Sequence, residues 1–183
     1  MLWRVTNANK DAVSLPRGAA LRQLEMHSDE RGVLTEMYRV GWAQGFDPVQ
    51  WNVVSSNAGV LRGVHVHATH SDYLIIIKGR ATIGLRDLRR CGSYRSWAGT
   101  VEMTGERIEA LSIPPGVAHG FYFHEPTIAL YGVSHFWNPE DELGCHWADP
   151  ELEITWPMDT ATISERDASA PPLCELLSAI ESA

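Results

Sequence analysis

The feature that most constrains this chain is a series of short apolar or alternating runs, each ended by Gly, Pro, Asn or Asp. Runs of this kind, bounded by turn residues, are typical of β-strands. Many short strands leave unpaired edges, and closure into a barrel or two-sheet jelly roll removes them. We therefore predict an all-β barrel. The expected strands cover residues 34–38, 50–55, 59–65, 73–78, 80–87, 108–113, 119–123 and 128–136.

Turns and one helix are indicated by other local patterns. Residues 78–80, centred on Gly79, lie between two strand-like runs and predict a tight hairpin. Apolar residues at helical spacing occur near the C-terminus, after Pro171 and Pro172, and predict a short helix. Its apolar positions are Leu173, Leu176, Leu177 and Ile180.

Length and residue pattern favour a single domain. The 183 residues suffice for one sizeable core, and no repeat or long linker divides them. We predict one domain over residues 1–183, with extensions at about 1–20 and 158–183 packing on the barrel.

Charge and cysteine content exclude several classes of protein. The net charge is -8, whereas a nucleic-acid-binding protein needs a clustered positive face. The apolar runs are too short to cross a bilayer, so no membrane partner is expected. Cys91, Cys145 and Cys174 lie far apart without a paired spacing, which argues against a disulfide framework. With no apolar signal segment at the N-terminus, the prediction is a cytoplasmic protein.

Histidine placement gives the first indication of a functional site. His65 and His67 are two apart in a predicted strand, so their side chains should face the same side. His119 follows a Pro-Pro-Gly turn and is a third candidate. The remaining candidates, His70 and His124, are predicted to lie on the surface.

Several motifs then carry a specific resemblance. The chain contains LRGVH (61–65), IPPGVAHGF (113–121), WADPELEITWP (147–157) and ISERDASAP (163–171), preceded by DERG (29–32) and QWN (50–52). In this order they resemble the motifs of the dTDP-4-dehydrorhamnose 3,5-epimerases, from about residue 22 to 175. The resemblance implies a double-stranded β-helix of the cupin type, an isomerase of deoxysugar biosynthesis for a lipopolysaccharide or an antibiotic, a nucleotide-linked sugar as substrate, and a homodimer.

The resemblance also implies roles for individual residues. His65 matches the base that removes a proton next to the 4-keto group, Asp167 the carboxylate that orients it, and Tyr131 the acid. Substrate contacts are implied for Arg62, His119, Arg31, Gln50, Asn52 and Trp137, the last aligning with a second tyrosine of the family's site. No cofactor is implied.

Two positions depart from the family's pattern. His67 stands where the family has glutamine, and Asp72 where it has a lysine that supports the enolate oxygen. The spacing from His65 to Gly79 instead resembles the metal-binding cupin motif HxHx4Ex6G, with aspartate for glutamate. Two alternatives therefore stay open: a non-catalytic sugar-nucleotide-binding cupin, or a metal-dependent isomerase or oxygenase. The metal reading predicts one divalent transition metal ion held by His65, His67, Asp72 and His119.

Overall fold

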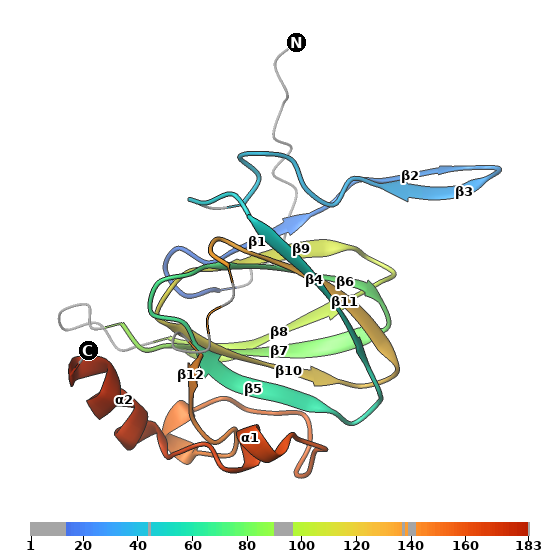
Figure 1. The fold of residues 1–183 in the computed structure, drawn as a ribbon. Helices are drawn as coiled ribbons and strands as arrows, with labels where there is room; N and C mark the ends of the chain where they lie inside the picture. The colour runs from blue at the N-terminus through green and yellow to red at the C-terminus, as the bar shows by residue number, and fades with distance from the viewer. Residues whose placement is uncertain (1–13, 44, 90–96, 137, 139–141, 183) are drawn as a thin grey trace.

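Short strands from the whole chain assemble into two facing layers in the computed structural model (Figure 1). The structure describes residues 14–43, 45–89, 97–136, 138 and 142–182. Among these residues, the strands form two five-stranded sheets and a separate two-stranded hairpin. The predicted all-β barrel is thus confirmed.

The first sheet has the strand order β1-β9-β6-β11-β4, with every neighbouring pair antiparallel. Its strands are β1 (Ala20–Gln23), β4 (Gln50–Ser56), β6 (Asp72–Lys78), β9 (Glu109–Ile113) and β11 (Thr127–Val133).

The second sheet has the order β12-β5-β10-β7-β8, again antiparallel throughout. Its strands are β5 (Leu61–Val66), β7 (Arg80–Asp87), β8 (Ala98–Thr104), β10 (Val117–Phe123) and β12 (Leu143–Gly144). The hairpin consists of β2 (Met26–Asp29) and β3 (Gly32–Thr35), and it projects away from the two sheets in Figure 1.

The predicted hairpin at residues 78–80 is wrong. β6 pairs with β9 and β11, whereas β7 pairs with β8 and β10, so the chain passes from one sheet to the other at Gly79. Gly79 has a φ of +85°, and a Cβ there would meet the Thr127 hydroxyl at 2.5 Å. The glycine is therefore required by a tight crossing between layers. A glycine between two strand-like runs does not reveal which sheet the second run joins.

One half of the space between the sheets is a packed apolar core. Side chains from β7, β8 and β9 meet those of β6 and β10 there, and Ile83, Leu85 and Leu111 are fully buried. Leu74, Phe123 and Ala129 belong to this core and also line a cavity in the other half. The core therefore forms the floor of the cavity.

The C-terminal segment covers the outer face of the second sheet. It contains a 3₁₀ turn, η2 (Pro150–Leu152), and the helices α1 (Glu165–Ala168) and α2 (Leu173–Ser182), which lie beside β5 and β12 in Figure 1. Leu173 and Leu176 pack on Val64 and Val66 of β5. The predicted C-terminal helix is confirmed, and Pro171 and Pro172 precede it. The N-terminal extension falls mostly outside the described residues, so the single-domain boundary stays a prediction.

No helix in the described part of the chain is both long and apolar enough to span a bilayer.

Gly63 offers a test of close packing between β5 and β10. A Cβ at Gly63 would lie 2.8 Å from the His119 carbonyl oxygen, whereas one at Gly59 would meet nothing within 4 Å. Both glycines have a positive φ, so alanine costs about 1–2 kcal/mol at either site. We expect Gly63→Ala to lower the free energy of unfolding by a further ~1–3 kcal/mol relative to Gly59→Ala. Urea denaturation measures both values, and equal losses would contradict the packing argument.

Candidate active site

A cavity of about 470 Å³ opens between the two sheets. Its walls come from β4, β6 and β11 of the first sheet and from β5 and β10 of the second, with residues 162–167 at the rim. A cavity of this size is within the usual range for small-molecule sites. The residues that face it include most of those predicted from sequence.

His65 and Asp167 form a direct pair at the wall of this cavity. His65 Nε2 lies 2.9 Å from Asp167 Oδ1, although the two residues are 102 positions apart. Both side chains line the cavity; that of Asp167 is 8% exposed and that of His65 23%, so the imidazole is the more open of the two. A carboxylate behind an imidazole fixes its tautomer and stabilises the positive charge that it gains on taking a proton.

Local structure holds Asp167 in place. Ser164 caps α1 by accepting a hydrogen bond from the Asp167 amide at 3.1 Å, and the Gly63 amide donates to Asp167 Oδ2 at 3.2 Å. The segment before α1 is tied to β5, since the Leu61 amide donates to the Thr162 carbonyl. Burial favours a raised pKa for Asp167, but the hydrogen bonds from His65 and Gly63 outweigh it and lower the pKa below its ordinary value of 3.8. Asp167 is thus a carboxylate at neutral pH.

Tyr131 lies on the opposite wall of the cavity. It belongs to β11 in the first sheet, whereas His65 belongs to β5 in the second. Burial raises the pKa of the Tyr131 phenol, and the negative charges of Asp72 and Glu142 raise it further, while Arg62 opposes them. The phenol therefore stays protonated at neutral pH and is able to donate a proton.

An irregularity in β5 brings Arg62 to the same cavity as His65. The β10–β5 register shifts between the pairs His119↔His65 and Phe121↔Arg62, so side chains three positions apart face the same space. Arg62 Nε donates to the Ser56 hydroxyl at 3.0 Å. Simple alternation along the strand does not predict this orientation for Arg62.

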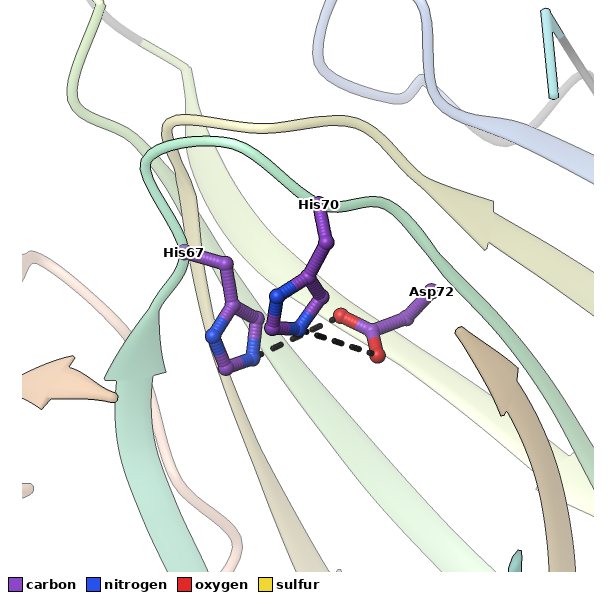
Figure 2. Close-up of side chains that lie close together, drawn as sticks. All are labelled: His67, His70 and Asp72. Carbon is purple, nitrogen blue, oxygen red and sulfur yellow. Dashed lines mark ion pairs between the residues drawn. The ribbon is translucent and has the colours of Figure 1, made fainter. Parts of the chain in front are cut away.

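A second group of side chains lies deeper in the cavity. We call His67, His70, Asp72 and His119 the histidine cluster; all four are at most 6% exposed. Figure 2 shows His67 and His70 turned toward the Asp72 carboxylate. The prediction that His70 lies on the surface is wrong, because the turn before β6 directs its ring inward and stacks it on His67 at 3.7 Å.

The predicted metal set is only partly brought together. His67, Asp72 and His119 lie in the histidine cluster, but His65 is bound to Asp167, and His70 is the third imidazole instead. Sequence spacing did not predict the orientation of His70. This residue lies in a turn, where side chains do not alternate between two faces as they do in a strand. His124, also predicted to be at the surface, is partly buried and bonds the Thr82 hydroxyl at 2.8 Å.

Burial and neighbouring histidines set the charge state of His119. The ring is buried, which lowers its pKa well below 6.5, and the nearby His67 lowers it further. Its Nδ1 lies 3.1 Å from the Val117 carbonyl oxygen, which can only accept a hydrogen bond. His119 is therefore neutral, with the proton on Nδ1 and a lone pair on Nε2.

Glu142 is a cavity residue that sequence reasoning missed. Its carboxylate lies 3.8 Å from His67 Nδ1 and 3.1 Å from the Arg166 guanidinium, and its side chain is 14% exposed. It stands just before β12, outside every quoted motif, so only the fold brings it to the cavity.

Comparison with known families decides the assignment. The sequence profile of the dTDP-4-dehydrorhamnose 3,5-epimerase family matches residues 14–175. This chain belongs to that family. The resemblance stated from the motifs is thus confirmed, and with it the isomerase class and the cupin-type fold.

Individual relatives agree with the family assignment. The dTDP-4-dehydrorhamnose 3,5-epimerase of Methanothermobacter thermautotrophicus is 33% identical over 169 residues, which cover 86% of this chain and 91% of that protein. The dTDP-6-deoxy-D-glucose-3,5-epimerase of Legionella pneumophila, solved with dTDP-4-keto-L-rhamnose, has a TM-score of 0.78 and 27% identity, covering 87% and 92%. A 3'-monoepimerase of Streptomyces bikiniensis, solved with dTDP-quinovose, has a TM-score of 0.78 and 28% identity, covering 91% and 87%.

The epimerase motifs imply substrate contacts for three residues that are not found in the cavity lining. Two of them lie outside the lining, and the third cannot be placed. Gln50 lies beside it and donates through Nε2 to Asn52 Oδ1 at 3.0 Å; Asn52 itself lines the cavity. Arg31 is exposed on the β2–β3 hairpin, where it pairs with Asp29. Trp137 lies outside the described residues.

The lowered pKa of Asp167 predicts a pH-dependent contribution to stability. Its charge stabilises the folded state above its ordinary pKa of 3.8, and this stabilisation is lost as pH falls through the lower, folded-state pKa. We expect Asp167→Asn to be less stable than wild type at neutral pH and the difference to shrink below about pH 4. Urea denaturation of both proteins across this range measures it. A difference that does not change with pH would contradict the charged pairing.

Proposed function

We propose that this protein epimerises a dTDP-linked 4-keto-6-deoxy sugar at C3, C5 or both by proton transfer through an enolate. One observation carries the proposal: a His65–Asp167 pair and a protonated Tyr131 face one cavity from opposite sheets. Membership of the epimerase family supports the same chemistry.

His65 is the base in this proposal. A 4-keto group acidifies the adjacent C–H bonds at C3 and C5. With Nε2 donating its hydrogen to Asp167, the Nδ1 lone pair of His65 takes the proton from carbon. The C–H electron pair then forms the enolate, whose negative charge lies largely on the former ketone oxygen. Asp167 stabilises the imidazolium that results.

Tyr131 returns the proton in this proposal. A sugar ring held between the sheets has one face toward β5 and the other toward β11, so the phenol protonates the face opposite to His65. Inversion at carbon follows from this arrangement. The resulting phenolate regains its proton, and His65 releases its own, before the next turnover.

Structural relatives of this chain differ in the number of sugar carbons that they invert. Both a 3,5-epimerase bound to dTDP-4-keto-L-rhamnose and a 3'-monoepimerase bound to dTDP-quinovose resemble this fold at the same TM-score. Arg62 and Asn52 line the cavity and supply a cation and an amide for the nucleotide-linked part of the substrate.

Deuterium exchange tests the reaction directly. In D₂O, the wild-type protein should catalyse the entry of solvent deuterium into dTDP-4-keto-6-deoxyglucose at C3, C5 or both. Loss of the ¹H NMR signals of these positions measures the exchange. His65→Asn removes the base and Tyr131→Phe removes the acid, and each should lower the rate of epimerisation by about 10²–10⁴-fold.

Tyr122→Phe is the matched control for Tyr131→Phe. Tyr122 is on β10 but does not line the cavity, so its variant should keep the wild-type rate. Full activity in either site variant overturns the assigned role. The absence of exchange in the wild type would point to a different substrate or a binding protein.

A homodimer is part of the proposal. Val33 and Leu34 on the hairpin are 58% and 63% exposed, and Val53 on β4, the edge strand of the first sheet, is 68% exposed. A second copy that covers these apolar side chains would remove an exposed edge. The hairpin would then reach the neighbouring cavity, which accounts for Arg31 matching a nucleotide-binding position while lying away from its own cavity.

Sedimentation of two variants tests this assembly. Wild type should sediment as a species of twice 20.4 kDa, and Val53→Asp should shift it toward the monomer because a charge would be buried. Thr100→Asp is the control, since Thr100 is exposed on β8, the edge strand of the second sheet. A monomeric wild type, or equal effects of the two variants, would contradict the proposed interface.

The cytoplasmic location predicted from the cysteine pattern also belongs to this proposal. Cys145 and Cys174 are free thiols, Cys145 buried and Cys174 exposed. Free thiols fit a reducing compartment. Fractionation of cells that express the protein would test the location.

A further inference from the structure

The histidine cluster lies beside the proposed catalytic pair, and the proton transfers described above do not use it. His67 and His70 come from the connection between β5 and β6, Asp72 begins β6, and His119 comes from β10. All four side chains are buried, and the three imidazoles meet around the one carboxylate. The atoms that face one another within the cluster indicate which kind of ligand it suits.

The Nε2 atoms of the three imidazoles face the Asp72 carboxylate. The separations are 3.6 Å from His67 to Oδ2, 3.5 Å from His119 to Oδ2 and 4.0 Å from His70 to Oδ1. They exceed the roughly 2.7–3.2 Å of an N–H···O hydrogen bond. They are close to the ~3.3–3.6 Å between ligand atoms around a tetrahedral ion with bonds of about 2.0–2.2 Å.

The far side of the His119 ring is held in a way that suits a metal ligand. His119 Nδ1 donates to the Val117 carbonyl at 3.1 Å. A carbonyl partner of this kind fixes the tautomer of a metal-bound imidazole. The Glu142 carboxylate lies 3.8 Å from His67 Nδ1, on the far side of the second ring. The Nε2 lone pair of His119 then faces a carboxylate oxygen, and a cation between these two electron-rich atoms would stabilise both.

We propose that the histidine cluster binds one divalent first-row transition metal ion. Its ligands are Nε2 of His67, His70 and His119 and the carboxylate of Asp72. Ligand atoms of His67, His70 and Asp72 already lie within 4.8 Å of one another. His119 is outside this group of three, but its Nε2 lies 3.5 Å from Asp72 Oδ2, so it is the fourth ligand of the proposed site. Three imidazoles with one carboxylate select such an ion over Mg²⁺ or Ca²⁺, which prefer oxygen ligands.

The ion gives the cavity an electrophile, a role that rests on the proposed function. Asp72 stands where the family has a lysine, so the cluster replaces that ammonium group with a metal centre. As His65 takes the proton from carbon, the C–H electron pair moves into the carbonyl group, and the ion stabilises the charge on oxygen as a Lewis acid. Zinc sites can expand to five ligands, which leaves a position for this oxygen. The proposed reaction would therefore depend on a metal, whereas the family resemblance implies no cofactor.

Metal binding is measured first, independently of activity. Protein produced without a polyhistidine tag is stripped with a chelator, dialysed against Co²⁺ and examined by elemental analysis and visible absorption. We expect about one Co²⁺ per chain with the ligand-field bands of a nitrogen- and oxygen-bound ion. Substoichiometric binding without such bands in the wild-type protein overturns the site, and this measurement does not depend on any variant folding.

Variants then assign the ligands. His70→Ala and Asp72→Ala should weaken Co²⁺ binding by more than about tenfold, by analogy with the 10–100-fold effect of removing even an outer partner. His124→Ala is the matched control, because His124 follows the far end of the strand that carries His119 and is not in the cluster. Circular dichroism checks that each variant is folded. Unchanged affinity in a folded His70→Ala and Asp72→Ala overturns the ligand assignment.

Deuterium exchange in stripped and reconstituted protein separates the two proposals. If exchange is lost when the metal is stripped and restored when metal is added back, the result supports both the epimerase reaction and the Lewis-acid role. Exchange at the full rate in the stripped protein overturns the Lewis-acid role and leaves the epimerase proposal intact. Stoichiometric Co²⁺ binding without exchange in any preparation keeps the metal site and overturns the proposed function.

Discussion

Two sheets share one interior, and their inward-facing positions must both fill a core and line a cavity. The chain meets both needs by dividing the space: side chains of β7, β8 and β9 pack one half, and polar groups of β5, β6, β10 and β11 face the other. Leu74, Phe123 and Ala129 belong to both halves. A side chain in the cavity is therefore held by the same strands that hold the core, so its position is fixed before any ligand arrives.

This division also explains the chemistry that the cavity supports. Because its walls belong to different sheets, His65 and Tyr131 face the cavity from opposite sides, as the proposed proton transfers require. Burial keeps Tyr131 protonated, while hydrogen bonds to Asp167 overcome burial and keep it ionised. One cavity thus holds a protonated phenol at one wall and, at the other, a charged carboxylate paired with His65.

The sequence predicted the strands and the His65–Asp167 pair to different extents. Alternation and turn residues predicted most barrel strands, but not that Gly79 carries the chain between sheets, because local pattern does not specify pairing partners. His65 and Asp167 were predicted together only through family motifs, since no spacing rule connects residues 102 positions apart. The sequence did not predict that His70 and Glu142 face the cavity, because side-chain direction in turns and connections does not follow from sequence spacing. Arg31 matched its motif yet lies away from the cavity, because a motif does not specify where the hairpin that carries it lies relative to the barrel.

Asp167 is reached late in synthesis, and this has a consequence for the newly made chain. Every strand of both sheets precedes it, so a ribosome releases the complete set of barrel strands before the partner of His65 has emerged. While the last part of the chain is still being made, His65 lacks its carboxylate partner and the outer face of β5 lacks its cover. A chain cut short after β12 would be without both Asp167 and the apolar side chains of Leu173 and Leu176 that pack on Val64 and Val66, so one truncation would remove a site residue and expose an apolar surface together.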